Sequence, residues 1–587
     1  MLKIFKYLKR DDWFFVLISV IFVVAQVGLD LTLPDYMSKI TTLVQTEGSE
    51  LSSIFAAGGM MLLCALGSFA LAVIVGFFAA RVAATFARRL RHGVFEKVEN
   101  FSMEEINGFS TASLITRSTN DVTQVQTLIS MGLQVMVKAP IMAVWAIIKI
   151  SGKSWQWTMS TGVAVVFLVL IIVIIITLAM PRFRRIQTLT DNLNQVTREN
   201  LTGIRVVRAY NAEEYQQEKF LKANTDLTEN HLFTSRVMSI MSPGMSIIMN
   251  GLTLSIYWIG AYLINQAQVM DRISLFSDMV VFSSYAMQVV SAFMMLTMIF
   301  IIFPRASVSI KRIMEVLGTE PKIIDGSVVT GKSGMEGEVE FRNVSFKYPD
   351  GADYVLENIN FTAHKGETIA FIGSTGSGKS TLVNLIPRFF DTTEGQILVD
   401  GIDVKDYTAE ALRNKLGYVS QKAVMFNGTI ESNVGYGDNG KAAYTEENIK
   451  KAIEIAQGKD FVEQTKNQYQ GLVAQEGANL SGGQKQRLSI ARAICREPEI
   501  FIFDDSFSAL DYKTDKILRG ALKKETENVT SFIVAQRIGT IKDADQIIVL
   551  DEGRTVGIGT HRELLADCEV YQQIALSQLS KEELEHE

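Results

Sequence analysis

The chain has 587 residues, a formal net charge of −6 and 48% hydrophobic residues, with the hydrophobicity concentrated in its first half. This length leaves room for several domains. The mildly negative charge and the lack of a basic patch argue against nucleic acid as a partner. Cys64, Cys495 and Cys568 form no close pair and no metal-site spacing, so reduced thiols are expected.

The first half is predicted to be a membrane domain. Residues 1–12 are short and basic enough for an interfacial helix, and residues 13–304 are predicted to form the transmembrane domain. Its apolar segments are long enough to cross roughly 30 Å of hydrocarbon. There are six, near residues 13–35, 54–80, 133–150, 157–180, 246–265 and 275–303.

Basic residues predict the orientation of this domain. Arg81, Arg88, Arg89 and Arg91 follow the second segment, whereas the loop after the first carries Glu47 and Glu50. By the positive-inside rule both termini are predicted to be cytosolic. The long connections 81–132 and 181–245 are read as helices that carry the bundle into the cytosol.

Four residues within the spans are candidates for a substrate cavity. Asp30 and Asp278 are ionisable groups in a membrane segment, a feature that predicts function and would favour cationic substrates. Met287 and Met295 belong to a methionine-rich and aromatic stretch whose flexible side chains suit varied apolar ligands. Two alternatives stay open, namely that the acids are solvated near the outer interface and that the methionines only pack helices.

A linker is predicted over residues 305–337 and an α/β ATPase domain over 338–587. Strands that alternate with helices favour a core of the parallel type, with its ligand at the carboxyl ends of the strands. The predicted strands are 339–348, 355–362, 368–372, 396–400, 416–420, 500–503 and 531–535.

The strand 368–372 leads into a glycine-rich loop and a helix, the setting of a P-loop. Backbone N–H groups of such a loop close around phosphates, because the N-terminus of a helix favours anions. Lys379 can reach the outer phosphates and Ser380 can hold Mg²⁺. The residues predicted to bind the nucleotide here are Gly373, Ser374, Thr375, Gly376, Ser377, Gly378, Lys379, Ser380 and Thr381.

Two further motifs complete the predicted chemistry. Asp504 and Asp505 follow the apolar strand 500–503, where the first can hold Mg²⁺ and the second takes the place of a general base. About a hundred residues after the P-loop, Ser481-Gly482-Gly483 forms a second helix start that is suited to phosphate.

Leu480-Ser481-Gly482-Gly483-Gln484 resembles the signature motif of ABC transporters, and the resemblance extends over essentially the whole chain. Six spans before one ATPase domain resemble the half-transporter of an ABC exporter. The resemblance implies ATP and Mg²⁺ as ligands, with each ATP held between the P-loop of one chain and the signature of another. It assigns adenine stacking to Tyr348, the Q-loop and a Mg²⁺ contact to Gln421, and the D-loop to Asp511.

Two positions depart from the family pattern. Asp505 stands where the family has a catalytic glutamate, and Gln536 stands where it has a histidine. A carboxylate set back by about an ångström loses its alignment with water, and glutamine carries no proton near neutral pH. These departures resemble the degenerate-site subunit of heterodimeric bacterial multidrug exporters.

The resulting prediction is a multi-pass subunit in the bacterial cell membrane, paired with a homologous half-transporter chain. It would export amphipathic small molecules, lie among membrane lipids, and lend its signature to the competent ATP site of its partner. One alternative is a homodimeric ABC exporter or lipid flippase. Another, of a different class, is an ATP-gated channel or regulator.

Overall fold

The computed structural model describes residues 2–46, 48–151, 154–349, 351–441, 444–525 and 528–578. Met1 and residues 579–587 of the predicted domains, and Glu47 of the orientation argument, lie outside the described residues. The chain divides into two compact units. The first comprises residues 1–99 and 111–319, and the second comprises residues 100–110 and 320–587.

The first unit is helical. A 3-10 helix, Leu2–Tyr7, precedes α1, and a π-helical turn, Gly132–Met136, joins α5 to α6. Six of its helical segments are long and apolar enough to cross a membrane, which confirms the prediction of six spans. The helices are α1 Arg10–Gln45, α2 Leu51–Glu99, α4 Thr111–Ser118, α5 Asn120–Met131, α6 Lys138–Ser151, α7 Trp155–Thr202, α8 Ile204–Ala209, α9 Glu213–Ser239, α10 Met241–Gln266 and α11 Val269–Gly318.

Buried aromatic residues join these helices near one end of the bundle. Trp157 of α7 is fully buried, and its indole nitrogen donates to the carbonyl of Ile256 in α10 at 3.1 Å. The Tyr285 hydroxyl of α11 donates to the carbonyl of Leu31 at 3.0 Å and to Asp35 at 2.7 Å, both in α1. The indole N–H of tryptophan and the hydroxyl of tyrosine need a hydrogen-bond partner when they are buried. These contacts therefore fix how α7 packs along α10 and how α11 packs along α1.

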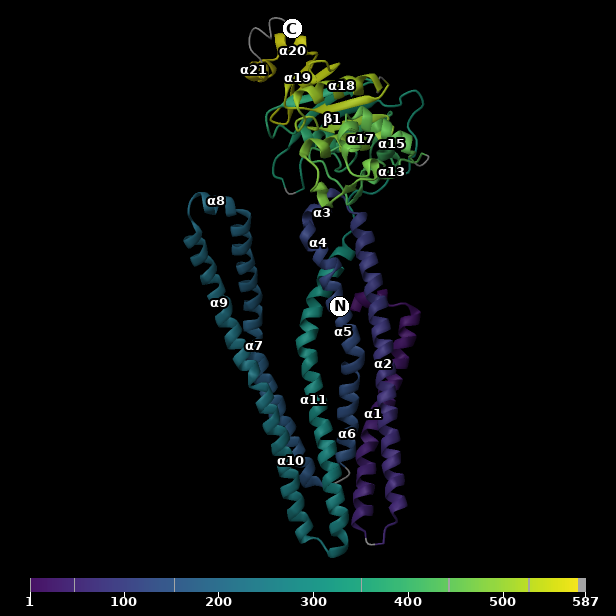
Figure 1. The fold of residues 1–587 in the computed structure, drawn as a ribbon, viewed down its shortest axis with the longest axis vertical. Helices are drawn as coiled ribbons and strands as arrows, with labels where there is room; N and C mark the ends of the chain where they lie inside the picture. Colours follow the sequence, from purple (N-terminus) through teal and green to yellow (C-terminus); the bar gives the residue numbers. More distant parts are fainter. Residues whose placement is uncertain are drawn as a thin grey trace. The chain divides into compact units, whose positions relative to one another are not determined.

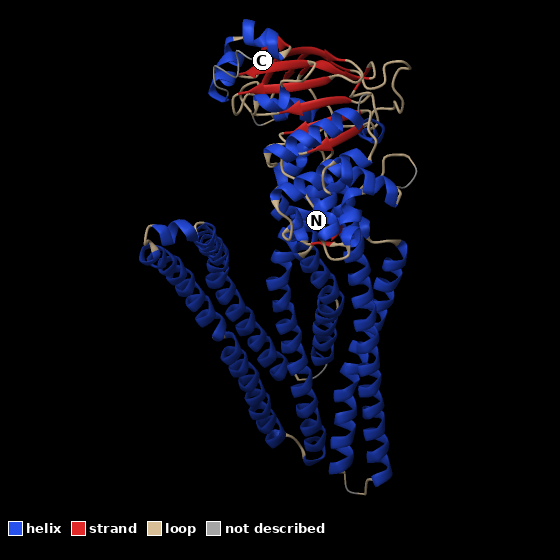
Figure 2. Ribbon diagram, turned by 45° about the horizontal axis from the view of Figure 1, so that its top comes forward, coloured by secondary structure: helices blue, strands red, loops and turns tan. Residues whose placement is uncertain are grey.

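The helices α7, α8, α9 and α10 form an arm of the first unit. Figure 1 and Figure 2 show α7 and α9 side by side, with the short helix α8 at the turn between them. Exposed apolar and aromatic side chains surround this turn, among them Val206, Tyr210 and Tyr215. Apolar surface left in water at such a turn is typical of a contact made with another chain or domain.

The second unit contains two main sheets. A six-stranded sheet has the order β12-β11-β3-β10-β9-β6, parallel except for β12, and a four-stranded antiparallel sheet has the order β2-β1-β4-β5. The strands are β1 Val339–Phe346, β2 Leu356–Ala363, β3 Thr368–Gly373, β4 Glu394–Val399, β5 Ile402–Asp403, β6 Leu416–Val419, β7 Gly428–Thr429, β8 Leu472–Val473, β9 Ile500–Asp504, β10 Thr530–Val534, β11 Gln546–Asp551 and β12 Arg554–Gly559.

Helices cover the sheets of the second unit. The core between them is built from apolar residues such as Phe341, Phe371 and Phe532. The helices are α3 Met103–Phe109, α12 Lys379–Leu385, α13 Ala409–Asn414, α14 Ile430–Val434, α15 Glu446–Ile455, α16 Lys459–Gln464, α17 Gly482–Cys495, α18 Tyr512–Glu525, α19 Ile538–Ile541, α20 His561–Asp567 and α21 Glu569–Gln578.

The observed bounds refine the predicted ones. The predicted strands correspond to β1, β2, β3, β4, β6, β9 and β10, whereas the antiparallel pairing of β1 with both β2 and β4 was not predicted. The predicted linker begins inside α11, which continues to Gly318. The helix is amphipathic there, and Ile310, Ile313 and Val316 of its last turns are buried.

Candidate functional site

The P-loop lies between β3 and α12, as predicted. Gly378 precedes the helix with a φ of +93°, and a Cβ there would come within 2.7 Å of Leu356. A Cβ at Gly373 would come within 2.0 Å of the carbonyl oxygen of Leu550. Both positions therefore require glycine, because a side chain would collide with Leu356 or with the carbonyl of Leu550. With its glycines directly ahead of the N-terminus of α12, the loop fits a nucleoside phosphate.

Lys379 is drawn into this loop by its own backbone. Its ammonium donates to the carbonyls of Gly373 at 2.9 Å and Ser374 at 2.6 Å, and to the hydroxyl of Ser377 at 3.3 Å. Burial lowers the pKa of Lys379, while the nearby carboxylates oppose this effect. The Lys379 ammonium is desolvated and is held only by carbonyl and hydroxyl oxygens. It can exchange these partners for phosphate oxygens, which carry full negative charge and bind a cation more strongly.

Ser380 and Asp504 form the candidate Mg²⁺ pair. The Ser380 hydroxyl donates to Asp504 at 2.7 Å, so a residue of the loop and one from the end of β9 meet. Burial raises the pKa of Asp504, and the hydrogen bond from Ser380 lowers it. Among the described residues, no group of three or more His, Cys, Asp or Glu side chains could hold a metal. A hydroxyl and a carboxylate are ligands that suit Mg²⁺, which uses few protein ligands and completes its shell with phosphate and water.

The two residues that depart from the family pattern contact each other. The Gln536 amide donates to the Oδ2 atom of Asp505 at 2.8 Å, and the Gln421 amide approaches the same oxygen at 3.4 Å. Asp505 has a φ of +48° and is 9% exposed, and its backbone N–H donates to Val534. One of the two carboxylate oxygens at the base position, Oδ2 of Asp505, thus accepts from two amides.

Tyr348 is held beside the P-loop helix. Its hydroxyl lies 3.0 Å from that of Thr381, and its ring meets Phe346 and Phe390 in edge-on contacts with centroids 5.0 and 5.3 Å apart. This position next to the loop is compatible with the predicted stacking on adenine, which stays a prediction.

The signature residues lie at the exposed start of α17. The Ser481 hydroxyl accepts the backbone N–H of Gln484, and the Gln484 side chain accepts that of Ser481 at 2.8 Å, a reciprocal cap. A Cβ at Gly482 would meet nothing within 4 Å. The fold of this chain therefore does not itself require glycine at this position. Leu480 packs partly against the core, and Gly483 lies against the D-loop.

The D-loop connects the base position to the next helix. The Ser508 hydroxyl donates to the carbonyl of Asp505 at 2.9 Å, and the exposed Asp511 accepts the backbone N–H of Thr514 at the start of α18. That backbone donor lowers the pKa of Asp511. A cavity of about 230 Å³ opens here, lined by Asp505, Phe507, Ser508, Val534, Ala535, Gln536, Arg537 and Thr540.

One contact of this region was missed in the sequence. Gln578, in α21, donates to the carbonyl of Gln536 at 2.7 Å and accepts the N–H of Ile538 at 2.9 Å. Both contacts fix the backbone that presents Gln536. No local pattern marks Gln578, since a single glutamine at the end of an amphipathic helix is ordinary.

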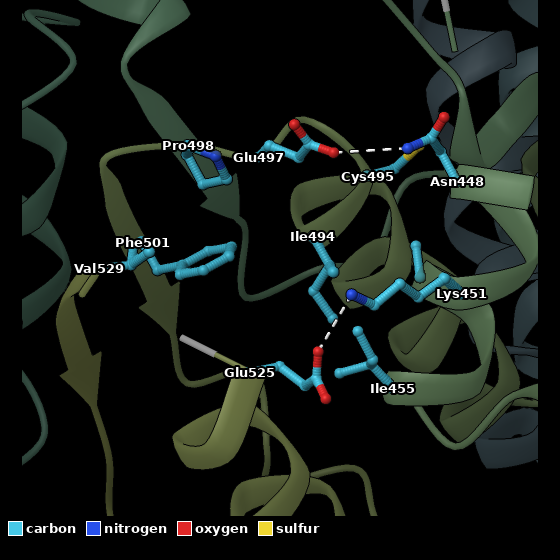
Figure 3. Close-up of a pocket in the computed structure, with 11 residues that line it drawn as sticks. Asn448, Lys451, Ile455, Ile494, Cys495, Glu497, Pro498, Phe501, Glu525 and Val529 are labelled. Carbon is cyan, nitrogen blue, oxygen red and sulfur yellow. Dashed lines mark hydrogen bonds and ion pairs between the residues drawn. The ribbon is translucent and has the colours of Figure 1, made fainter. Parts of the chain in front are cut away.

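A second cavity of the ATPase unit lies apart from the motif residues (Figure 3). It has a volume of about 310 Å³, between α15, α17 and the start of β9. Its charged groups already have partners: Lys451 forms an ion pair with Glu525 at 3.2 Å, and the Asn448 amide donates to Glu497 at 3.4 Å. Burial raises the pKa of Cys495 in its wall to about 11, so the thiol is unreactive.

In the spans, Asp30 is paired. Lys138 of α6 donates to Asp30 at 3.0 Å, the Ser68 hydroxyl of α2 donates to its other oxygen, and Gln288 of α11 lies 3.4 Å from its carbonyl. Sequence reasoning identified Asp30 but not Lys138. The acid therefore has its counter-ion within the protein, and it does not offer the unpaired charge that the expected preference for cations assumed.

The other candidate cavity residues lie on α11. Asp278 and Met287 are half-buried, and Met295 packs partly buried against the membrane core. None of these three residues, nor Asp30, lines the large cavity of about 860 Å³ in this unit. Their predicted contact with substrate stays a prediction.

Comparisons with known proteins agree with this architecture. Residues 16–293 match the ABC transporter transmembrane region and residues 356–508 match the ABC transporter family. An uncharacterized ABC transporter ATP-binding protein of Mycobacterium tuberculosis strain H37Rv is 41% identical over 523 residues, 89% of this chain and 87% of that protein. The uncharacterized ABC transporter ATP-binding protein YfiB of Bacillus subtilis strain 168 is 35% identical over 568 residues, 96% of each chain.

Two further similarities are informative. An ATP-dependent lipid A-core flippase of Aromatoleum aromaticum is 30% identical over 493 residues, 84% of this chain and 80% of that protein. A solved structure of a bacterial Atm1-family ABC exporter with ATP bound matches with a TM-score of 0.80 and 23% identity, over 97% of this chain and 98% of that one. At this identity the match concerns the fold.

Proposed function

Because the chain belongs to the ABC transporter family, in which an ATPase domain drives transport through a membrane region, we propose that it is one subunit of a heterodimeric exporter. Its own ATP site is degenerate, and its signature completes the competent site of a homologous partner chain. The complex exports amphipathic compounds from a bacterial cell, with both termini of this chain in the cytosol.

The hydrogen bond between Gln536 and Asp505 carries this proposal. A general base must accept a proton from the attacking water, so its carboxylate oxygen has to be within reach of that water. Asp505 is shorter than glutamate and its Oδ2 atom already accepts from two amides. Gln536 has no proton to exchange near neutral pH, since an amide does not titrate there.

Nucleotide binding is proposed to remain intact at the same site. The glycines of the loop, Lys379 and the Ser380–Asp504 pair follow the usual pattern for holding triphosphate and Mg²⁺. Lys379 would hold the negatively charged phosphates of a bound ATP, and Ser380 would hold its Mg²⁺. A site that binds ATP and hydrolyses it slowly would keep two ATPase domains together for longer than a site that turns over.

The signature supports the other half of the proposal. Ser481 and Gly482 are exposed at the N-terminus of a 14-residue helix, where backbone N–H groups favour an anion. A Cβ at position 482 would meet nothing within 4 Å in this chain, so the surface at Gly482 is open to a ligand that approaches from outside.

The test is the ATPase activity of the purified chain alone and with the partner that co-purifies from its native membrane. We expect the chain alone to hydrolyse ATP slowly and the pair to be at least about a hundredfold faster, the usual contribution of a positioned base. Equal activity per site in a homodimer would refute the proposal.

A homodimeric exporter or lipid flippase is the second candidate. The observation that favours it is the 30% identity to lipid A-core flippases over more than four fifths of this chain. Under this alternative, Asp505 would reach the attacking water despite its contact with Gln536. Restoring the family residues with Asp505→Glu and Gln536→His would then change the activity of the chain alone only slightly.

A further inference from the structure

The first unit contains a large cavity away from the paired acids of the spans. Its volume is about 860 Å³, which suits a drug-sized or lipid-sized ligand. It lies between α7, the junction of α9 with α10, α11 and one residue of α5. The lining residues are Gln124, Ile172, Ile175, Ile176, Ala179, Met180, Phe183, Ile186, Gln187, Met238, Met241, Thr297, Arg305, Val308 and Arg312.

One wall of the cavity is a continuous apolar stripe. On α7 the lining residues follow one another at three and four positions, from Ile172 through Ile176 and Met180 to Phe183, so they share one helix face. Met238 and Met241 face the same space from the α9–α10 junction. Isoleucine supplies area and methionine supplies flexibility, which together accept an apolar body of variable shape.

The residues that α11 contributes to the lining include positive charge. Among the described lining residues, Arg305 and Arg312 are the only charged ones. They are seven positions apart on α11, roughly 10 Å along a helix. Arg312 is partly neutralised by Asp121, which lies 3.2 Å away, whereas Arg305 is exposed and makes no hydrogen bond or ion pair with any described residue.

We propose that this cavity binds an amphipathic anion, with its anionic group on Arg305 and its apolar body along α7. The inference rests on the proposed export function and names the substrate class. It follows from the charge of the lining, since Gln124, Gln187 and Thr297 are neutral and Asp121 already pairs with Arg312. Guanidinium groups bind carboxylate and phosphate groups through paired hydrogen bonds. Two sources share this chemistry, an anionic membrane lipid and a soluble amphipathic anion.

The first test measures binding without nucleotide, which separates it from the proposed function. The full-length chain, in the assembly in which it purifies, is placed in phosphatidylcholine nanodiscs and titrated with dansyl-undecanoate or its trimethylammonium analogue of equal length. We expect the parent to prefer the anion. Arg305→Gln should weaken anion binding about tenfold, the loss of a charge-assisted hydrogen bond, and leave the cation unaffected.

Two variants serve as controls. Arg305→Lys keeps the charge and should retain anion binding within a few-fold. Arg272→Gln removes an arginine from the same helix outside the cavity lining and should change nothing. The inference is overturned if Arg305→Gln binds the anion as well as the parent does, or if Arg272→Gln weakens it equally.

A second test identifies the occupant. Ile176→Cys, in a Cys64→Ser background, places a thiol in the apolar wall for labelling with a maleimide. Protection by dansyl-undecanoate in phosphatidylcholine supports the soluble source, and protection by added phosphatidylglycerol alone supports the lipid source. A thiol that no condition makes reactive would mean that helices of a second chain fill the cavity, which refutes the inference.

A failure of the proposed function has a different signature. If charge-selective binding is present but the purified pair neither hydrolyses ATP nor moves the probe across vesicles, the export function fails and the site stands. If ATPase activity is normal but binding ignores charge, the site fails and the export function stands.

Discussion

The Asp505→Asn variant separates a degenerate site from a working one. In a site where this carboxylate acts as general base, its loss lowers turnover by roughly 10²–10⁴. Here its Oδ2 atom accepts from Gln536 at 2.8 Å and from Gln421 at 3.4 Å. The amide of asparagine can preserve one of these contacts, with a local loss of about 1 kcal/mol because the charge assistance disappears. We therefore expect the paired complex to keep its ATPase activity within about twofold, far less than the loss of a base would cause.

The Gly482→Asp variant is the matched opposite. A Cβ at position 482 meets nothing within 4 Å, and an acidic residue near the first turn of α17 suits the helix dipole, so the fold should tolerate the change. Two unit charges 4 Å apart at an effective dielectric of 20 repel by about 4 kcal/mol. Placed against the ATP of the partner site, such a charge lowers turnover by about a thousandfold.

The assay is steady-state ATP hydrolysis by the reconstituted pair, with each variant beside the parent. Thermal unfolding of each variant controls for misfolding, and Gly482→Ala controls for the added Cβ without the charge. The reasoning is refuted if Asp505→Asn is as inactive as Gly482→Asp. In that case Asp505 acts on water in spite of Gln536.

Four further variants test the remaining contacts. Lys379→Ala removes the cation of the P-loop and should weaken ATP binding at this chain's site by tenfold or more, measured by nucleotide photolabelling. Burial raises the pKa of Asp504 above that in the unfolded chain, so ionisation of Asp504 lowers the stability of the fold as pH rises from about 4. Asp504→Asn should therefore have a higher unfolding temperature than the parent at pH 7 but not at pH 4. The pKa of Asp511 is lowered, so its ionised form stabilises the fold above about pH 4, and Asp511→Asn should have a lower unfolding temperature than the parent at pH 7. Asp30→Asn should leave Lys138 unpaired and lower the unfolding temperature. The double variant Asp30→Asn with Lys138→Met should recover that temperature. Asp30→Asn should also transport cations no worse, relative to neutral compounds, than the parent does.

Much of the fold could be predicted because its signals are local. A span of the membrane needs only an apolar run of sufficient length, and the P-loop needs a strand, glycines at fixed offsets and a helix. Four strands after the P-loop, β4, β6, β9 and β10, were predicted for the same reason, whereas β11 and β12 were missed. The antiparallel sheet was not predicted, because the pairing of β1 with β4 joins residues that are 49 to 60 positions apart, and no pattern in either strand identifies its partner.

The sequence was sufficient to identify Asp505 and Gln536 as unusual residues, but not to predict that they contact each other. Both positions were identified as departures, each from its own motif. Their proximity depends on β9 and β10 being neighbouring strands with Val534 opposite Asp504. Because of this register, the two strands end at the same edge of the sheet. Given that register, the two departures cease to be independent. A shorter acid and an amide donor at adjacent strand ends make one hydrogen bond, which a longer acid and a histidine would replace with a different geometry.

The charges in the spans lead to a related argument about substrates. Acids in an apolar sequence pointed to cations, because the sequence shows the charge but not its counter-ion. In the structure Asp30 pairs with Lys138, and Asp35 pairs with Lys149 at 2.7 Å. Each pair joins α1 to α6, so these charges cancel and hold two helices in register. The proposed preference for an anion depends on the charge that remains after such pairs are set aside, and in the lining of the large cavity that charge belongs to Arg305. Pairing of Asp30 with Lys138 removes one of the two acids on which the conditional expectation of cations was based.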